Sequence, residues 1–131
     1  DLRNGWKITS AYTYTQTKVT RDNNAAIVGL PLNLTPRHVL TAWATYRLPQ
    51  YQRVTVGLGG RYVSEQVGSY PFTLPSYFVA DASVVYVGDN YRITAGVKNV
   101  FDKAYYDGAI NANVVSPALP RTFSLGMTYF F

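Results

Sequence analysis

Cysteine is absent from this 131-residue chain, and His38 is its single histidine. Without cysteine there is no disulfide framework and no cysteine-based metal or redox site. A single histidine also argues against a metal site built from histidines. No Gly-rich phosphate loop occurs, and no spacing of Ser, Asp and His38 supports nucleophilic catalysis. We therefore expect no enzyme, no catalytic residues, no metal site and no resident cofactor.

Charge and long apolar runs are also scarce. Charged residues make up 15% of the chain, whereas soluble domains usually contain about 25%. The net charge is +5, but the Lys and Arg residues are scattered, so we expect no nucleic-acid partner. No apolar stretch is long enough for a transmembrane helix, and no signal peptide is recognisable. The mean hydropathy of −0.07 likewise excludes a helical membrane protein.

Tyrosine and strict alternation are what the chain has in excess. Twelve tyrosines are present, a load typical of the aromatic girdles of membrane barrels. Residues 121–131 alternate between large apolar and small or hydroxyl side chains, and this period of two predicts a strand with one apolar and one polar face. A final strand of this kind, ending on an aromatic residue, is typical of an outer-membrane β-barrel. The apolar positions are Phe123, Leu125, Met127, Tyr129 and Phe131.

The same pattern predicts about six antiparallel strands, each close to the roughly 9–11 residues that cross a bilayer at a tilt. We place them at residues 6–19, 37–48, 53–66, 77–87, 91–101 and 121–131. The charged residues of these strands fall opposite the aliphatic ones, where a wet lumen is expected, because an Arg or Lys facing lipid at the bilayer midplane costs about 2–4 kcal/mol. These residues are Arg47, Arg61, Asp81, Arg92 and Lys98.

The connections between the strands alternate in length. Turns at 49–52 and 88–90 are short, whereas the loops at 20–36, 67–76 and 102–120 are longer. Outer-membrane barrels have short periplasmic turns and longer extracellular loops. The chain is therefore predicted to be all-β, an antiparallel transmembrane β-barrel segment whose last strand ends in the periplasm.

About six strands cannot close a transmembrane barrel, because known single-chain barrels begin at eight strands and an open edge in lipid leaves backbone groups unsatisfied. The chain begins almost at its first strand, so we expect a piece of a larger up-and-down barrel. The alternative is a small barrel, stand-alone or self-assembling from copies of the chain, without transport activity. A soluble carbohydrate- or lipid-binding β-sandwich shows the same alternation, but the long strands and the tyrosines favour a membrane protein.

Several segments resemble the C-terminal barrel of TonB-dependent siderophore receptors, in the same order and over nearly the whole chain. The most specific are Lys-Asn-Val-Phe-Asp-Lys-Ala-Tyr-Tyr at 98–106, the pair Pro120-Arg121 and the terminal Phe131. The ferric-hydroxamate, ferrichrome-type branch is one candidate within this family. Weaker matches are Gly5-Trp6, Thr35-Pro36-Arg37-His38, Gly60-Arg61-Tyr62-Val63, and Leu74-Pro75-Ser76-Tyr77 with Asp81-Ala82.

The resemblance implies a plugged barrel of about 22 strands in the bacterial outer membrane, which imports ferric siderophores with energy from TonB. Residues 1–131 would form a C-terminal segment of the barrel domain, with no plug domain in the chain. The implied partners are the ferric siderophore as transported ligand, TonB through a plug outside this chain, lipid and lipopolysaccharide. Transport by this chain alone is not expected.

Two of the predicted outer loops carry candidate ligand-binding residues. Their aromatic and polar side chains suit a bulky, partly apolar iron chelate, and no direct iron ligand is expected because the siderophore fills the coordination sphere of the metal. The alternative is that the tyrosines belong to an interfacial belt. The candidates are Tyr70 and Phe72 in one loop, and Tyr105, Tyr106, Asn111 and Asn113 in another.

The terminal strand and the loop before it carry further candidate roles. Phe123, Tyr129 and Phe131 resemble the C-terminal signal read by the outer-membrane assembly machinery, although a lipid-facing girdle would place aromatics there too. Asn99 and Asp102 are expected to cap the turning backbone after the fifth strand. Arg121 is expected either to pair with lumenal or lipopolysaccharide anions or to be a plain solvated charge.

Overall fold

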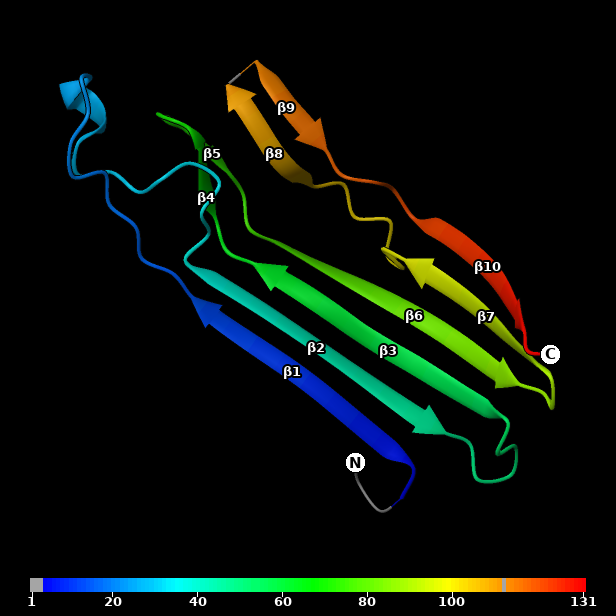
Figure 1. The fold of residues 1–131 in the computed structure, drawn as a ribbon. Coiled ribbons are helices and arrows are strands. Elements are labelled where there is room, and N and C mark those ends of the chain that lie inside the picture. The colour runs from blue at the N-terminus through cyan, green and yellow to red at the C-terminus, as the bar shows by residue number, and fades with distance from the viewer. Residues whose placement is uncertain (1–3, 112) are drawn as a thin grey trace.

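A curved antiparallel sheet forms the centre of the computed structural model, which describes residues 4–111 and 113–131 (Figure 1). Its six strands lie in the order β1-β2-β3-β6-β7-β10. Each neighbouring pair is antiparallel, so the predicted all-β architecture is confirmed. The strands are β1 (Trp6–Tyr14), β2 (His38–Arg47), β3 (Val54–Val63), β6 (Tyr77–Val87), β7 (Tyr91–Lys98) and β10 (Thr122–Tyr129).

The pairing register keeps one apolar and one polar face through the whole sheet. Because successive side chains of a strand point to opposite faces, residues that are direct cross-strand partners share a face. The apolar face includes the partners Ile8, Ala44, Leu58 and Ala82. The polar face includes the partners Thr45, Gly57, Ser83, Gly96 and Ser124.

The apolar face is exposed. Leu58 is 62% exposed and Leu125 is 80% exposed, which is unusual for a protein whose surface meets only water. A β-sandwich would bury the apolar face of each sheet against a second sheet. In the part of the chain that the structure describes, no second sheet packs on this face, contrary to the sandwich alternative.

Aromatic residues gather at both ends of this apolar face. At the end of the short turns, Trp6 stacks on Tyr46 with ring centroids 4.6 Å apart, and Tyr91 pairs with Tyr129 across β7 and β10. At the opposite end, the Tyr12 hydroxyl lies 2.8 Å from Nδ1 of His38. Aliphatic residues fill the band between the two ends, as the girdles and apolar belt of a membrane barrel require.

The first strand is shorter than the sequence predicted. β1 ends at Tyr14 rather than at residue 19. After the backbone bond from Thr15 N–H to Arg37 O, Val19 pairs instead with the loop, through bonds of 2.8 Å to Leu30 and Gly29. The rest of residues 15–37 is irregular apart from the short 3-10 helix η1 (Ala25–Ile27).

The other two outer connections contain hairpins that the sequence analysis placed in loops. β4 (Gln66–Ser69) pairs with β5 (Phe72–Leu74), and β8 (Tyr106–Asn111) pairs with β9 (Val114–Pro117). The predicted third and fifth strands also end early, at Val63 and Lys98. The fifth ends there because Asn99 has a left-handed φ of 52°, which breaks the extended ladder. Both hairpins lie at the end of the sheet opposite the C-terminus (Figure 1).

The short turns at the other end are joined by an ion pair. Nη2 of Arg53 lies 2.6 Å from Oδ1 of Asp89, and both side chains are exposed. The Tyr86 hydroxyl and the Asp89 carboxylate raise the pKa of Arg53. The Arg53 guanidinium therefore stays protonated, and the ion pair links the turn before β3 to the turn after β6.

Within the described residues, no helix is both long and apolar enough to cross a membrane.

Candidate functional site

A cavity of about 730 Å³ lies against the polar face of the sheet, near its outer end. One cavity can touch every strand of a sheet only if the sheet curves around it, so the polar face is concave. Loop 99–121 covers part of the cavity with Tyr105, Asp107, Leu119 and Pro120. The strand residues around it include Thr9 of β1, Thr41 of β2, Arg61 of β3, Asp81 of β6, Lys98 of β7 and Ser124 of β10.

Trp43 of β2 forms one wall of the cavity, and two glycines of β3 make room for its indole. A Cβ on Gly57 would lie 2.7 Å from Cζ2 of Trp43. A Cβ on Gly59 would overlap Cε3 of the ring and lie 2.5 Å from the carbonyl oxygen of Ala42. Both positions therefore require glycine, and the indole lies closely against the β3 backbone.

The charged side chains that line the cavity differ in whether they have a partner in the structure. Oδ1 of Asp81 accepts a hydrogen bond of 2.8 Å from the Asn99 backbone N–H. Arg61 and Lys98 form no ion pair within residues 4–111 and 113–131. Asp107 of β8 lines the outer side and is exposed. The sheet side of the cavity thus carries two cations, Arg61 and Lys98, and one carboxylate, Asp81.

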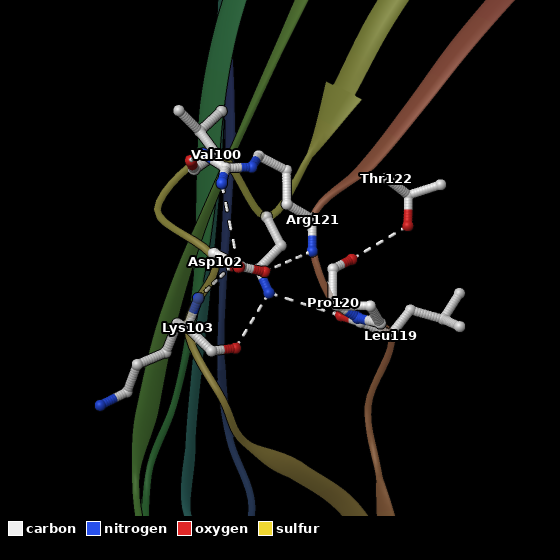
Figure 2. Close-up of polar contacts among 8 residues, drawn as sticks. Val100, Asp102, Lys103, Leu119, Pro120, Arg121 and Thr122 are labelled. Carbon is white, nitrogen blue, oxygen red and sulfur yellow. Dashed lines mark hydrogen bonds and ion pairs between the residues drawn. The ribbon is translucent and has the colours of Figure 1, made fainter.

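The base of loop 99–121 is fixed by hydrogen bonds (Figure 2). Asn99 is only 4% exposed, and its Oδ1 accepts from the Lys103 N–H at 2.9 Å while its Nδ2 donates to the Lys103 carbonyl at 2.9 Å. Oδ1 of Asp102 accepts from the Arg121 N–H at 2.8 Å. The predicted capping roles of Asn99 and Asp102 are confirmed.

Arg121 is held at the same place. Its Nη2 lies 3.9 Å from Oδ2 of Asp102, and its Nη1 donates to the Val100 carbonyl at 3.4 Å. The structure thus gives Arg121 a half-exposed carboxylate partner in its own loop, which is neither the lumenal or lipopolysaccharide anion nor the plain solvation that the sequence analysis considered.

Tyr105 packs loop 99–121 against the polar face of the sheet. Its ring lies 4.3 Å, centroid to centroid, from that of Tyr77, and the guanidinium carbon of Arg61 lies 5.6 Å from the centre of the Tyr77 ring. Tyr77 belongs to a small buried cluster with Val63 and Val79, against which Tyr105 is packed. Stacking and cation–π attraction therefore connect loop 99–121 to β3 and β6.

The two outer hairpins pack against each other. A Cβ on Gly68 of β4 would lie 3.0 Å from the Cβ of Ala109 of β8, and Leu74 of β5 is fully buried. The Leu34 N–H donates to the Val67 carbonyl at 2.7 Å, which ties the loop of residues 15–37 to β4. All three outer connections thus form one packed unit.

The predicted ligand residues are spread over this unit. Tyr105 lines the cavity on the polar face. Tyr70, 55% exposed at the β4–β5 turn, lines a second cavity of about 840 Å³ beside the loop of residues 15–37. Phe72 packs against Gly68. Tyr106 and both asparagines lie along the β8–β9 hairpin, where Oδ1 of Asn111 accepts from the Asn113 N–H at 2.9 Å.

Sequence reasoning missed Trp43, Arg61, Lys98 and Asp81 as members of one cavity. Their position on the polar face followed from the period of two, but their proximity depends on the cross-strand register.

On the opposite face of β10, Phe123 and Tyr129 are exposed, and the Phe131 ring lies 6.4 Å from that of Tyr129.

Residues 1–100 match the sequence pattern of a protein family described as "TonB dependent receptor-like, beta-barrel". The chain belongs to this family. Its members are outer-membrane receptors and not enzymes, in agreement with the expectation from the sequence. The curved sheet is accordingly part of a receptor barrel wall.

Characterised relatives are much longer than this chain. The ferric-pyoverdine M114 receptor PbuA of Pseudomonas sp. strain M114 is 34% identical over 76% of this chain, which corresponds to 13% of the receptor. The metal-pseudopaline receptor CntO of Pseudomonas aeruginosa is 29% identical over 93% of this chain and 18% of its own length. The chain thus spans less than a fifth of these relatives.

Solved receptor structures contain the same arrangement of strands. The siderophore receptor PiuA from Acinetobacter baumannii superposes with a TM-score of 0.86 at 24% identity, over 98% of this chain and 20% of that receptor. The ferric-catecholate import receptor Fiu of E. coli gives 0.77 at 27% identity, over all of this chain and 19% of Fiu. The six strands match the C-terminal part of such barrels.

Proposed function

We propose that this chain forms the last six membrane-spanning strands of an outer-membrane receptor that imports ferric siderophores with energy passed from TonB. The observation that carries the proposal is the cavity between the concave polar wall and loop 99–121, in a chain of this family. Such a cavity can hold a ligand that enters from outside the cell. The ferric siderophore is the transported ligand and not a cofactor.

The chain acts as part of a larger receptor. Residues 1–131 are the C-terminal segment of the barrel domain, and TonB is engaged through a plug domain outside them. Within the described residues, β1 pairs only with β2 and β10 only with β7. In lipid, the open edges need further strands to satisfy their backbone groups, so this segment does not transport by itself.

The outer hairpins supply the ligand contacts in this proposal. Tyr70 and Phe72 come from the β4–β5 hairpin, while Tyr105 and Tyr106 lie on and before β8, with Asn111 and Asn113 near its tip. The names of the relatives refer to pyoverdine, pseudopaline and catecholate ligands. The ferric-hydroxamate branch, suggested by the sequence motifs, remains one proposal among these chelator classes.

The apolar face supplies the contacts with the membrane. Its aromatic ends are placed to meet lipid and lipopolysaccharide headgroups, and its aliphatic band to meet acyl chains. We propose that Phe123, Tyr129 and Phe131 are the residues that the outer-membrane assembly machinery recognises. Their exposure on one side of β10 supports such a contact.

Iron uptake tests this function. The full-length receptor that contains these residues would be expressed in cells that lack their own siderophore receptors, and uptake of radioactive iron measured with ferric siderophores of several classes. We expect TonB-dependent uptake for at least one class, and its loss when residues 106–117 are replaced by a short Gly-Ser turn. Uptake of no ferric siderophore by a correctly inserted receptor would contradict the proposal.

The open edges favour a second candidate, a barrel assembled from copies of this chain. Six strands are an even number, so β10 of one copy and β1 of the next run antiparallel with their apolar faces on the same side. The mass of the purified 131-residue chain in detergent decides between the two. A single defined multimer with barrel-like resistance to unfolding supports self-assembly, whereas monomers or polydisperse aggregates support the receptor segment.

A further inference from the structure

We propose that Gly68 of β4 and Ala109 of β8 are positioning residues of the receptor. Their contact fixes Tyr105 and Asp107 at the cavity and thereby sets the affinity for the transported chelate. The described lining of the cavity includes neither Gly68 nor Ala109, so both would act through the residues that they position. The inference rests on the function proposed above, because it concerns how the same site is kept in place for its ligand.

Three residues at alternate positions in β8 and just before it make contacts on the inner side of the hairpin. Tyr105 lines the cavity and stacks on the sheet. Asp107 also lines the cavity. Ala109 is buried against the β4–β5 hairpin, whereas the intervening Tyr106 and Ile110 are exposed. Asp107 therefore lies between two points of contact, one at Tyr105 and one at Ala109.

The contact at Ala109 requires that residue 68 has no side chain. A Cβ on Gly68 would lie 3.0 Å from the Cβ of Ala109, 3.1 Å from Cδ1 of Phe72 and 3.4 Å from Cγ of Leu74. Carbon atoms in favourable contact lie about 3.5–4.0 Å apart. Because Leu74 is fully buried, a methyl group at position 68 has no free space on its own hairpin. It would push against β8.

The β4–β5 hairpin is the more firmly attached of the two hairpins. Only residues 64–65 separate β3 from β4, and only residues 75–76 separate β5 from β6. The Leu34 N–H also donates to the Val67 carbonyl in β4. The β8–β9 hairpin is joined to β7 and β10 by the longer segments 99–105 and 118–121. When the contact between the hairpins becomes too tight, β8 is therefore the strand that moves.

An outward movement of β8 changes the site without removing any group from it. Asp107 and Tyr105 would lie farther from the polar face of the sheet, which forms the other side of the cavity. Binding sites lose affinity when their contact groups depart from the productive geometry by more than about 0.5 Å. The size of the residue at position 68 should therefore change ligand affinity, although that residue touches no ligand.

Titration of the full-length receptor, purified in detergent, tests this effect. The probes are ferric pyoverdine, after which one relative is named, and iron(III) bound to a tris-catecholate or to a linear tris-hydroxamate. Quenching of tryptophan fluorescence gives the affinity and the number of binding sites per receptor. For each probe that binds, Gly68→Ala is expected to weaken affinity about tenfold and to leave the number of sites unchanged. A merely structural role would lower the number of sites instead, because the receptors that remain folded would bind normally.

Moving the methyl group across the interface provides the rescue. The double variant Gly68→Ala/Ala109→Gly keeps the same number of carbon atoms at the contact, and its affinity is expected to return to within about twofold of the unaltered receptor. Ala109→Gly alone creates no overlap, so it remains informative if Gly68→Ala does not insert, and it is expected to weaken affinity about threefold. Gly108→Ala is the matched control in the same strand, because a Cβ there meets only Ser116, at 3.6 Å.

Hydrogen exchange of the ligand-free receptor tests the positioning by itself. Gly68→Ala is expected to raise exchange in residues 106–117 and not in β2 or β3, and the double variant to restore it. If no probe binds the unaltered receptor, the proposed function fails, while hydrogen exchange still decides whether the contact positions β8. The inference is overturned if Gly68→Ala leaves this exchange unchanged, if it leaves the affinity for a bound probe unchanged, or if the double variant recovers neither.

Discussion

Asn99 fixes the base of loop 99–121 through the hydrogen bonds of its side-chain amide. It is buried, its φ of 52° is left-handed, and its amide bonds both the N–H and the carbonyl of Lys103. Asparagine tolerates this backbone conformation better than most residues. The loop base therefore depends on both the shape and the hydrogen bonds of this one residue.

Replacing Asn99 by Ala removes those part-buried bonds and puts a residue that tolerates a left-handed φ less well at this position. We expect Asn99→Ala to lower the free energy of unfolding of the full-length receptor by about 2–3 kcal/mol, as measured by urea unfolding in lipid vesicles. Asn90→Ala, in the exposed turn between β6 and β7, is the matched control and should change stability by less than about 0.5 kcal/mol. Equal effects of the two substitutions would contradict the assigned role.

The glycines under Trp43 give a second residue-scale prediction. Gly59→Ala places a methyl group into the indole and against the Ala42 carbonyl, and such overpacking costs about 1–3 kcal/mol. Gly126→Ala is the control, because nothing lies within 4 Å of a Cβ at that position. Urea unfolding of both variants compares their free energies of unfolding. A Gly59→Ala receptor as stable as the control would show that the indole does not require glycine at this position.

At the residue scale, the sequence predicted the roles that depend only on residues close by in the chain. The capping roles of Asn99 and Asp102 follow from how Asx side chains bond the backbone nearby. The partner of Arg121 could not be derived in this way, because Asp102 lies 19 residues away in sequence. The Trp43 cavity wall was missed for the same reason, since the glycines that support it belong to the next strand.

At the scale of elements, period-two alternation identified all six spanning strands, and the predicted β6 range of 77–87 matches the observed one. Alternation in a long strand is a strong signal because one face must avoid lipid. The β4–β5 and β8–β9 hairpins were predicted as loops because their strands are short and rich in Gly, Ser and Asn. Their existence depends on packing around Leu74 and Ala109, which no local pattern reveals.

Removal of the Tyr105 ring is expected to destabilise loop 99–121. Tyr105→Ala is expected to increase amide hydrogen exchange across residues 99–121, because the stack on Tyr77 and the contact with the Val63 cluster are lost. Tyr106→Ala, one position along and 41% exposed, should leave exchange nearly unchanged. Hydrogen exchange of the full-length receptor, read by mass spectrometry, compares the two, and unchanged exchange in Tyr105→Ala would refute the anchoring role.

At the scale of the whole molecule, the two faces of the sheet have opposite requirements. The apolar face is exposed between two aromatic ends, while the polar face curves around a cavity lined by Arg61, Asp81 and Lys98. Composition and alternation predicted this division and the incomplete barrel. They could not predict the curvature or the cavity, which arise from how neighbouring strands and loops pack.

The central claim is that the polar face borders water inside a barrel while the apolar face borders lipid. Because these 131 residues contain no cysteine, single cysteines can be introduced here in a receptor freed of any others and labelled with nitroxide spin labels in liposomes. Oxygen, which concentrates in lipid, should relax labels on one face, and a water-soluble nickel chelate should relax labels on the other. The positions are Leu58, Val84 and Leu125 for lipid, and Thr45, Ser83 and Ser124 for water.

The adjacent pairs make the result decisive. The account predicts that accessibility to the two reagents reverses between Ser83 and Val84 and again between Ser124 and Leu125. Accessibility that is uniform along β6 and β10, or that alternates with the opposite phase, would contradict it.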